Sequence, residues 1–122
     1  MTTLRVGACQ IDPQLGEVDR NLERIERALA DAAAASVALA VLPECAVTGY
    51  AFASLDEAMP VARRASAVAA DRIAELATRH RMTVICGSLE SEGDAVYNVA
   101  HLATPDGRRC RRHRPPTRGS RR

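Results

Sequence analysis

The spacing of apolar residues along the chain alternates between a helical pattern and a strand-like pattern. Between residues 17 and 35 the apolar positions follow one another at steps of four and three, with charged residues on the opposite side. These positions are Val18, Leu22, Ile25, Leu29 and Ala32. The same kind of spacing returns over residues 61–80. The pattern therefore predicts two amphipathic helices.

Short apolar segments between and after these helices predict four strands. They comprise residues 4–11, 37–42, 83–90 and 95–104. Residues 37–42 are apolar at every position, as a strand buried on both faces requires. A turn sequence at residues 91–94 predicts that the last two strands form a hairpin. Residues 43–60 contain two prolines and a glycine without a clear period, which predicts a long functional loop with room for a helical turn.

The order strand, helix, strand, loop, helix, strand, strand predicts an α/β fold with a right-handed parallel crossover. A chain of 122 residues fits one small domain. Its core is thin, because 23 residues are alanine and only three are aromatic. No apolar run is long enough for a membrane span, and the N-terminus does not resemble a signal peptide. We therefore expect a cytoplasmic protein with reduced cysteines.

Charge is divided unevenly along the chain. All 17 basic residues are arginine. Residues 1–107 contain nine of them and all 15 acidic residues, whereas residues 108–122 contain eight arginines and no acidic residue. The second segment also lacks aliphatic and aromatic residues, so we expect a disordered arginine-rich tail. Such a tail could neutralise phosphates, which keeps open an alternative function as a non-catalytic nucleic-acid-binding or interaction protein.

The residue most suggestive of chemistry is Glu44, which follows the all-apolar segment 37–42 after a single proline. Ligands of open α/β sheets bind in the crevice at the carboxyl ends of the strands. A carboxylate there, partly withdrawn from water, suits proton transfer. The alternative is that Glu44 only accepts hydrogen bonds from backbone N–H groups of its loop. The position alone leaves both interpretations open.

Four segments within residues 4–107 have a characteristic order and spacing. They read LRVGACQIDPQLGEVDRNLERI, LAVLPECAVTGY, VICGSLE and VYNVAHLATPDG. Together they resemble the first part of the nitrilase (carbon–nitrogen hydrolase) superfamily. The resemblance implies an α/β fold of the αββα sandwich type, truncated here to its first strands and two helices. It also implies a Glu–Lys–Cys catalytic set that hydrolyses small amides or nitriles. We expect no cofactor and no metal ion, because no cysteine or histidine pair has metal-ligand spacing.

The resemblance assigns roles to two residues. In the family the glutamate is the general base towards the cysteine thiol, and this role falls on Glu44. The family carries an aromatic residue nearby, so Tyr50 is a candidate for the substrate pocket, with a tyrosine that simply fills the loop as the alternative. The lysine stabilises developing negative charge and should follow Asp106-Gly107, but the sequence contains no lysine. The family's nucleophilic cysteine lies farther on than this chain reaches.

None of the four cysteines is expected to replace that nucleophile. Cys9 and Cys86 lie in predicted buried strands, where cysteine usually serves as a small core residue. Cys45 adjoins Glu44, but neighbours on an extended segment point in opposite directions. Cys110 lies in the predicted tail, where no base is positioned beside it.

We therefore interpret residues 1–107 as the N-terminal part of a carbon–nitrogen hydrolase domain that is inactive alone, and residues 108–122 as a tail. The abrupt loss of apolar residues motivates the hypothesis that the reading frame shifts near residues 108–110. A sheet that ends after the fourth strand would leave an open edge and an uncovered apolar face, which favours self-association. We expect neither a membrane nor nucleic acid as a partner.

Overall fold

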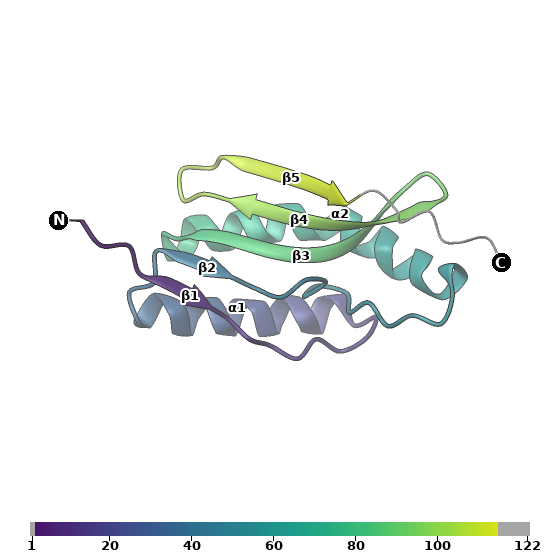
Figure 1. Ribbon diagram of the computed structural model, residues 1–122, viewed down its shortest axis with the longest axis horizontal. Helices are drawn as coiled ribbons and strands as arrows, with labels where there is room; N and C mark the ends of the chain where they lie inside the picture. Colours follow the sequence, from purple (N-terminus) through teal and green to yellow (C-terminus); the bar gives the residue numbers. More distant parts are fainter. Residues whose placement is uncertain (1, 115–122) are drawn as a thin grey trace.

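The computed structural model describes residues 2–114, which form a β-sheet with two helices packed against it (Figure 1). The elements follow the order β1 (Val6–Ala8), α1 (Val18–Ala34), β2 (Leu39–Val41), α2 (Leu55–His80), β3 (Thr83–Glu92), β4 (Ala95–Ala103) and β5 (Arg109–Arg114). The predicted α/β class is confirmed.

The strands lie in the sheet in the same order as in the sequence. β1, β2 and β3 are parallel, and β4 and β5 extend the sheet antiparallel. The two parallel connections run through α1 and α2, and they advance across the sheet in the same direction. Crossovers of the same hand then place both helices on the same face, as Figure 1 shows. β3 and β4 form the predicted hairpin.

α1 agrees with the predicted helix to within one residue at each end. Its buried stripe contains the apolar positions read from the spacing, together with one polar residue, Asn21. The Asn21 amide donates to the carbonyl oxygens of Gln14 and Val47 at 2.8 and 2.9 Å, so it is buried with its partners present. Asn21 thereby ties α1 to the turn that follows β2.

α2 begins at Leu55 rather than at residue 61, so the predicted loop over residues 43–60 is wrong at its end. The side chain of Ser54 accepts a hydrogen bond of 3.1 Å from the N–H of Glu57 and caps the helix. Pro60 lies inside the helix near its start, where it removes a single backbone hydrogen bond. The capping residue therefore outweighs the proline that suggested a later start.

β5 contradicts the predicted disorder of residues 108–122 over the segment 109–114. The prediction considered only apolar burial, but a strand also gains hydrogen bonds from the backbone of its neighbour, here β4. Its arginines add ion pairs with α2 and β3: Arg109 with Asp71 at 2.6 Å, and Arg111 with Glu90 at 2.8 Å. β5 thus covers the edge expected to stay open, and residues 115–122 lie outside the described part.

The two faces of the sheet differ. The face covered by the helices carries the core, in which Ile25, Leu29 and Ile73 are fully buried. On the other face Val6 and Val41 are 55% and 37% exposed. We call this second face the open face; its apolar character agrees with the prediction of an uncovered sheet. Among residues 2–114 no helix has the length and apolar character needed to cross a membrane.

Candidate functional site

Glu44 begins a turn at the carboxyl end of β2, where the sequence places it. The chain stays attached to the sheet just before this point, because the N–H of Leu42 donates to the carbonyl of Ile85 on β3 at 2.8 Å. Residues 44–48 then form the turn. The carboxyl ends of the parallel strands meet at this edge, which is the usual ligand site of such sheets.

Gly87 on β3 fixes where this turn lies. Its carbonyl accepts a hydrogen bond from the N–H of Val47 at 3.1 Å, and its own N–H donates to the Pro43 carbonyl at 3.3 Å. A Cβ at residue 87 would lie 2.5 Å from the backbone N of Cys45 and 2.7 Å from Cα of Glu44. Non-bonded atoms do not approach so closely, so the turn can rest on β3 only because residue 87 is glycine.

The side chain of Asn98 on β4 connects Glu44 with Cys45. Its Nδ2 donates to Oε1 of Glu44, and its Oδ1 accepts a hydrogen bond from Sγ of Cys45 at 3.8 Å. The prediction for Cys45 assumed an extended backbone at residues 44 and 45, and this premise is wrong. Cys45 has a φ of 54°, in the left-handed region, so the turn brings its thiol to the amide that Glu44 binds.

Glu44 and Asn98 line a cavity of about 540 Å³ on this part of the sheet. Its other lining residues include apolar residues of β3 and β4, Leu42 directly after β2, and two basic residues of β5, Arg112 and His113. A carboxylate, an amide and a guanidinium beside apolar walls suit a small polar molecule. Among residues 2–114 no group of three or more histidine, cysteine, aspartate or glutamate residues is placed to hold a metal ion.

The structure does not bring Tyr50 into this cavity. Tyr50 follows the turn, and its side chain is 75% exposed. Glu44 is exposed as well, so the expectation that it is partly withdrawn from water is wrong for the described residues. Glu44 lies at the open face of the sheet, beside Gly87 and Asn98, where residues 2–114 build no opposing wall. A pocket role for Tyr50 therefore stays a prediction.

The cysteines near the sheet are poor nucleophiles. Burial, together with the charge of Glu44, raises the pKa of Cys45 to about 11. Burial raises the pKa of Cys86 to about 12 and also raises that of Cys9. Since the thiolate is the reactive form, these three cysteines are unreactive near neutral pH, as their strand and turn positions suggest. Cys110 is exposed and lies on β5.

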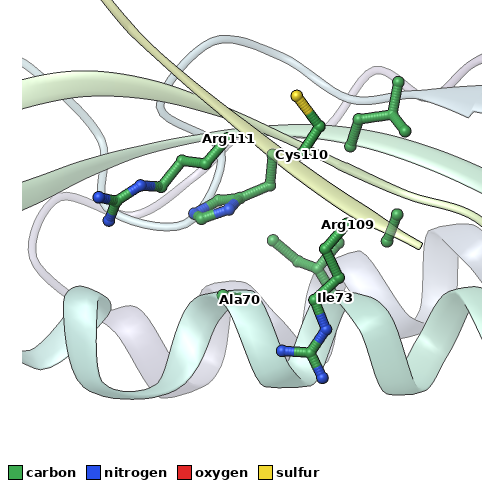
Figure 2. A pocket seen from close by; sticks show the side chains of 8 residues that line it. Ala70, Ile73, Arg109, Cys110 and Arg111 are labelled. Carbon is green, nitrogen blue, oxygen red and sulfur yellow. The ribbon is translucent and has the colours of Figure 1, made fainter. Parts of the chain in front are cut away.

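A second cavity of about 320 Å³ lies on the other side of the same strands, between α2 and the β4–β5 pair (Figure 2). Figure 2 shows Arg109 pointing towards α2 and Cys110 pointing away from it. Arg111 donates to the buried carboxylate of Glu90, which also contacts His101 at 2.5 Å. Desolvation raises the pKa of Glu90, but the hydrogen bonds and charges of these two partners outweigh it and lower the pKa. The cluster of Glu90, His101 and Arg111 pairs a buried charge within the fold. Glu44 does not line this second cavity, so the candidate site is the first one.

The structure adds three residues to the site that are absent from the sequence-based prediction. A glycine inside a strand pattern is a known sign of close backbone approach, and Gly87 carried that signal. Asn98 carried no comparable signal, because its partners are distant in the sequence. Arg112 was missed because the sequence predicted disorder there.

Fold and site together define an α/β protein with a carboxylate at the carboxyl end of a parallel strand, set beside an amide and a cation. Such an arrangement suits acid–base chemistry on a small polar molecule. The model of the family described as carbon–nitrogen hydrolase matches residues 5–117. The chain belongs to the carbon–nitrogen hydrolase family. The match continues beyond residue 107, the predicted end of the domain.

Known relatives agree with this assignment. A nitrilase of Pyrococcus abyssi (strain GE5 / Orsay) is 29% identical over 105 residues, which cover 85% of this chain and 40% of that protein. The structure of a CN-hydrolase superfamily protein of Xanthomonas campestris superimposes with a TM-score of 0.79 at 22% identity, over 93% of this chain and 41% of that one. The structure of the NitFhit protein of C. elegans superimposes with a TM-score of 0.77 at 16% identity. The superposition covers 89% of this chain and 27% of that one.

These structures share the nitrilase-type fold with this chain, so the predicted fold class is confirmed. The chain spans less than half of each of these three proteins. This partial coverage fits the prediction that the first strands and two helices of the sandwich are present.

Proposed function

We propose that this chain supplies the general base, Glu44, to a carbon–nitrogen hydrolase that acts on small amides or nitriles. The observation that carries the proposal is the position of Glu44 at the carboxyl end of β2, in one cavity with Asn98 and Arg112. Family membership supplies the reaction class. A general base has to be held within hydrogen-bond reach of the proton it accepts, and the contact with Asn98 supports such a role.

In the family reaction Glu44 would take the proton of a cysteine thiol. The thiolate then attacks the amide or nitrile carbon, ammonia or an amine leaves, and water cleaves the thioester. A pocket lined by Tyr50 would need an opposing wall over the open face. The proposal therefore assigns this chain one part of the catalytic set.

We expect the 122 residues to be inactive alone. The sequence contains no lysine, and the cation in the cavity is Arg112. A guanidinium is planar and larger than an ammonium group, so it does not replace a lysine at a tight oxyanion site. Residues 2–114 also place no reactive thiol beside Glu44, since the pKa of Cys45 is raised to about 11.

The first test is an assay of the purified chain on a panel of amides and nitriles, with ammonia release as the readout. The expected result is no turnover above that of the Glu44→Gln variant. Turnover in the unmodified chain that disappears in Glu44→Gln would contradict the proposed inactivity while supporting the role of Glu44.

The second test places Glu44 in a complete enzyme. In a chimera, residues 5–107 replace the matching segment of the Pyrococcus abyssi nitrilase, which keeps its own later residues. Glu44→Gln in the active chimera should lower kcat by about 10²–10⁴-fold, the usual contribution of a general base. Glu23→Gln, an exposed carboxylate on α1, is the matched control and should leave kcat unchanged. Equal activity of both variants would refute the assignment.

The alternative function, nucleic-acid binding by the arginines of residues 108–122, gains no support from the described residues. Three of these arginines face acidic residues of the same chain: Arg108 with Asp106, Arg109 with Asp71, and Arg111 with Glu90. Deleting residues 115–122, which leaves β5 in the sheet, tests the alternative. Salt-sensitive DNA binding that disappears with the deletion would favour it, and no binding in either chain would exclude it.

A further inference from the structure

Both ends of the Asn98 amide are engaged within the candidate site. Nδ2 donates to Glu44 Oε1, and Oδ1 accepts from Sγ of Cys45. An asparagine amide has two donors on nitrogen and an acceptor on oxygen, so its two ends are chemically different. Here each end meets the only kind of group that it can bind.

The two contacts select one orientation of the amide. If the amide were turned over, Oδ1 would face the Glu44 carboxylate, and two acceptors would oppose each other. Nδ2 would then face the Cys45 thiol, which donates its own hydrogen. The observed orientation satisfies both partners, whereas the reversed orientation opposes two acceptors at Glu44 and leaves Nδ2 only the weak acceptor capacity of the sulfur.

The Cys45 thiol remains a donor under ordinary conditions. Its side chain is 1% exposed, and burial with the charge of Glu44 raises its pKa to about 11. Near neutral pH the sulfur therefore keeps its hydrogen. The buried Cys45 thiol can therefore serve as a hydrogen-bond donor to Asn98 next to the Glu44 carboxylate.

The backbone that carries Asn98 is rigidly joined to the turn that carries Glu44. Asn98 lies opposite Leu89 in the β3–β4 ladder. The N–H of Leu89 donates to Oγ1 of Thr48, in the same turn as Glu44, at 3.0 Å. The turn and β4 are therefore both fastened to β3, so the Asn98 side chain meets a carboxylate whose backbone is already fixed.

We propose that Asn98 is the positioning residue of Glu44, and that the Cys45 thiol orients the Asn98 amide for this task. The terminal torsion of a glutamate is broad, so an exposed carboxylate needs a hydrogen bond to hold one orientation. Asn98 supplies that bond from a rigid strand. The inference rests on the proposed role of Glu44 as the base.

The test is NMR of the ¹³C,¹⁵N-labelled 122-residue chain across the titration of Glu44. The Asn98 side-chain NH₂ signals should shift with the same midpoint as the Glu44 carboxyl carbon. This pH-dependent shift should vanish in Glu44→Gln. Asn21 is the matched control, because its amide binds backbone carbonyls and should not respond. Asn98 signals that ignore the titration of Glu44 would overturn the inference.

Two variants test the part played by Cys45. Cys45→Ser keeps an O–H donor and should retain the titration response of Asn98. Cys45→Ala removes the donor and leaves the Glu44 carboxylate to orient the amide without the thiol, so the titration response of Asn98 should become smaller. An unchanged response in Cys45→Ala would overturn the orienting role of the thiol.

The active chimera adds a kinetic readout. Asn98→Ala should lower kcat by about 10²-fold with little change in KM, since a misplaced catalytic group slows the chemical step. A raised KM with unchanged kcat would overturn the positioning role. The two proposals can fail separately. If the Asn98 signals follow the titration of Glu44 but Glu44→Gln leaves kcat of the chimera unchanged, only the proposed function is refuted.

Discussion

Arg111 on β5 donates a hydrogen bond of 2.8 Å from Nη1 to Oε2 of Glu90, a carboxylate buried on β3. Glu90 is 3% exposed, and its Oε1 contacts Nε2 of His101 at 2.5 Å. A buried carboxylate is tolerated only when it is paired and hydrogen-bonded. The arginine-rich strand therefore neutralises a charge that β3 buries, and β5 is part of the folded sheet.

The first prediction concerns this ion pair. Arg111→Gln should lower the free energy of unfolding by about 1–3 kcal/mol, because it leaves a buried charged group with one partner fewer. Urea unfolding at pH 7 measures the change. Arg112→Gln is the matched control on the same strand, since its side chain lies at the other cavity, and we expect a change below about 0.5 kcal/mol. Equal effects of both substitutions would contradict the special role of Arg111.

The second prediction is a loss of stability in acid. Although desolvation raises the pKa of Glu90, His101 and Arg111 lower it overall. A carboxyl group whose pKa is lowered in the native state contributes its full stabilisation at pH values above its pKa in the unfolded chain, about 4.3. This contribution is lost as the pH falls through the pKa of the native state. Urea unfolding from pH 7 to pH 3 should show the difference between wild type and Glu90→Gln shrinking in acid. A constant difference over that range would disprove it.

The sequence predicts those parts of the fold that depend on local pattern. The spacing of Val18, Leu22 and Ile25 already specifies the buried face of α1, and the turn sequence after Glu90 specifies the hairpin. β5 could not be predicted in this way, because it is stabilised by the edge of β4 and by Glu90, which are properties of the folded sheet. The start of α2 was missed because a capping serine outweighs Pro60.

In the candidate site too, some features follow from the local sequence pattern and others depend on the folded sheet. Glu44 lies at the carboxyl end of β2, as its place after an apolar segment predicts, and its catalytic role stays a prediction. Its contact with Asn98 spans 54 positions in the sequence, so only the register of β3 and β4 reveals it. The position of Cys45 depends on one left-handed φ value, which no apolar pattern encodes.

The third prediction concerns the close contact beneath the turn. Gly87→Ala should lower the free energy of unfolding by about 1–3 kcal/mol, because the added Cβ overlaps the backbone of Cys45 and Glu44. Backbone NMR signals of residues 44–48 should shift as the turn is displaced. Gly93→Asn is the control: Gly93 has a φ of 58° with no atom near its added Cβ, and asparagine tolerates this conformation. A stable Gly87→Ala variant with unchanged turn signals would show that the turn lies elsewhere.

The fourth prediction concerns thiol reactivity. At pH 8 iodoacetamide should modify Cys110, which is exposed on β5, while Cys45 and Cys86 stay unmodified because burial raises their pKa values to about 11 and about 12. Peptide mapping by mass spectrometry identifies the labelled residues, and labelling in urea, where all four cysteines should react, is the control. Labelling of Cys45 as fast as Cys110 would show that the turn opens readily. A turn that opens would also release the thiol from Asn98, so the same result would count against an oriented Glu44.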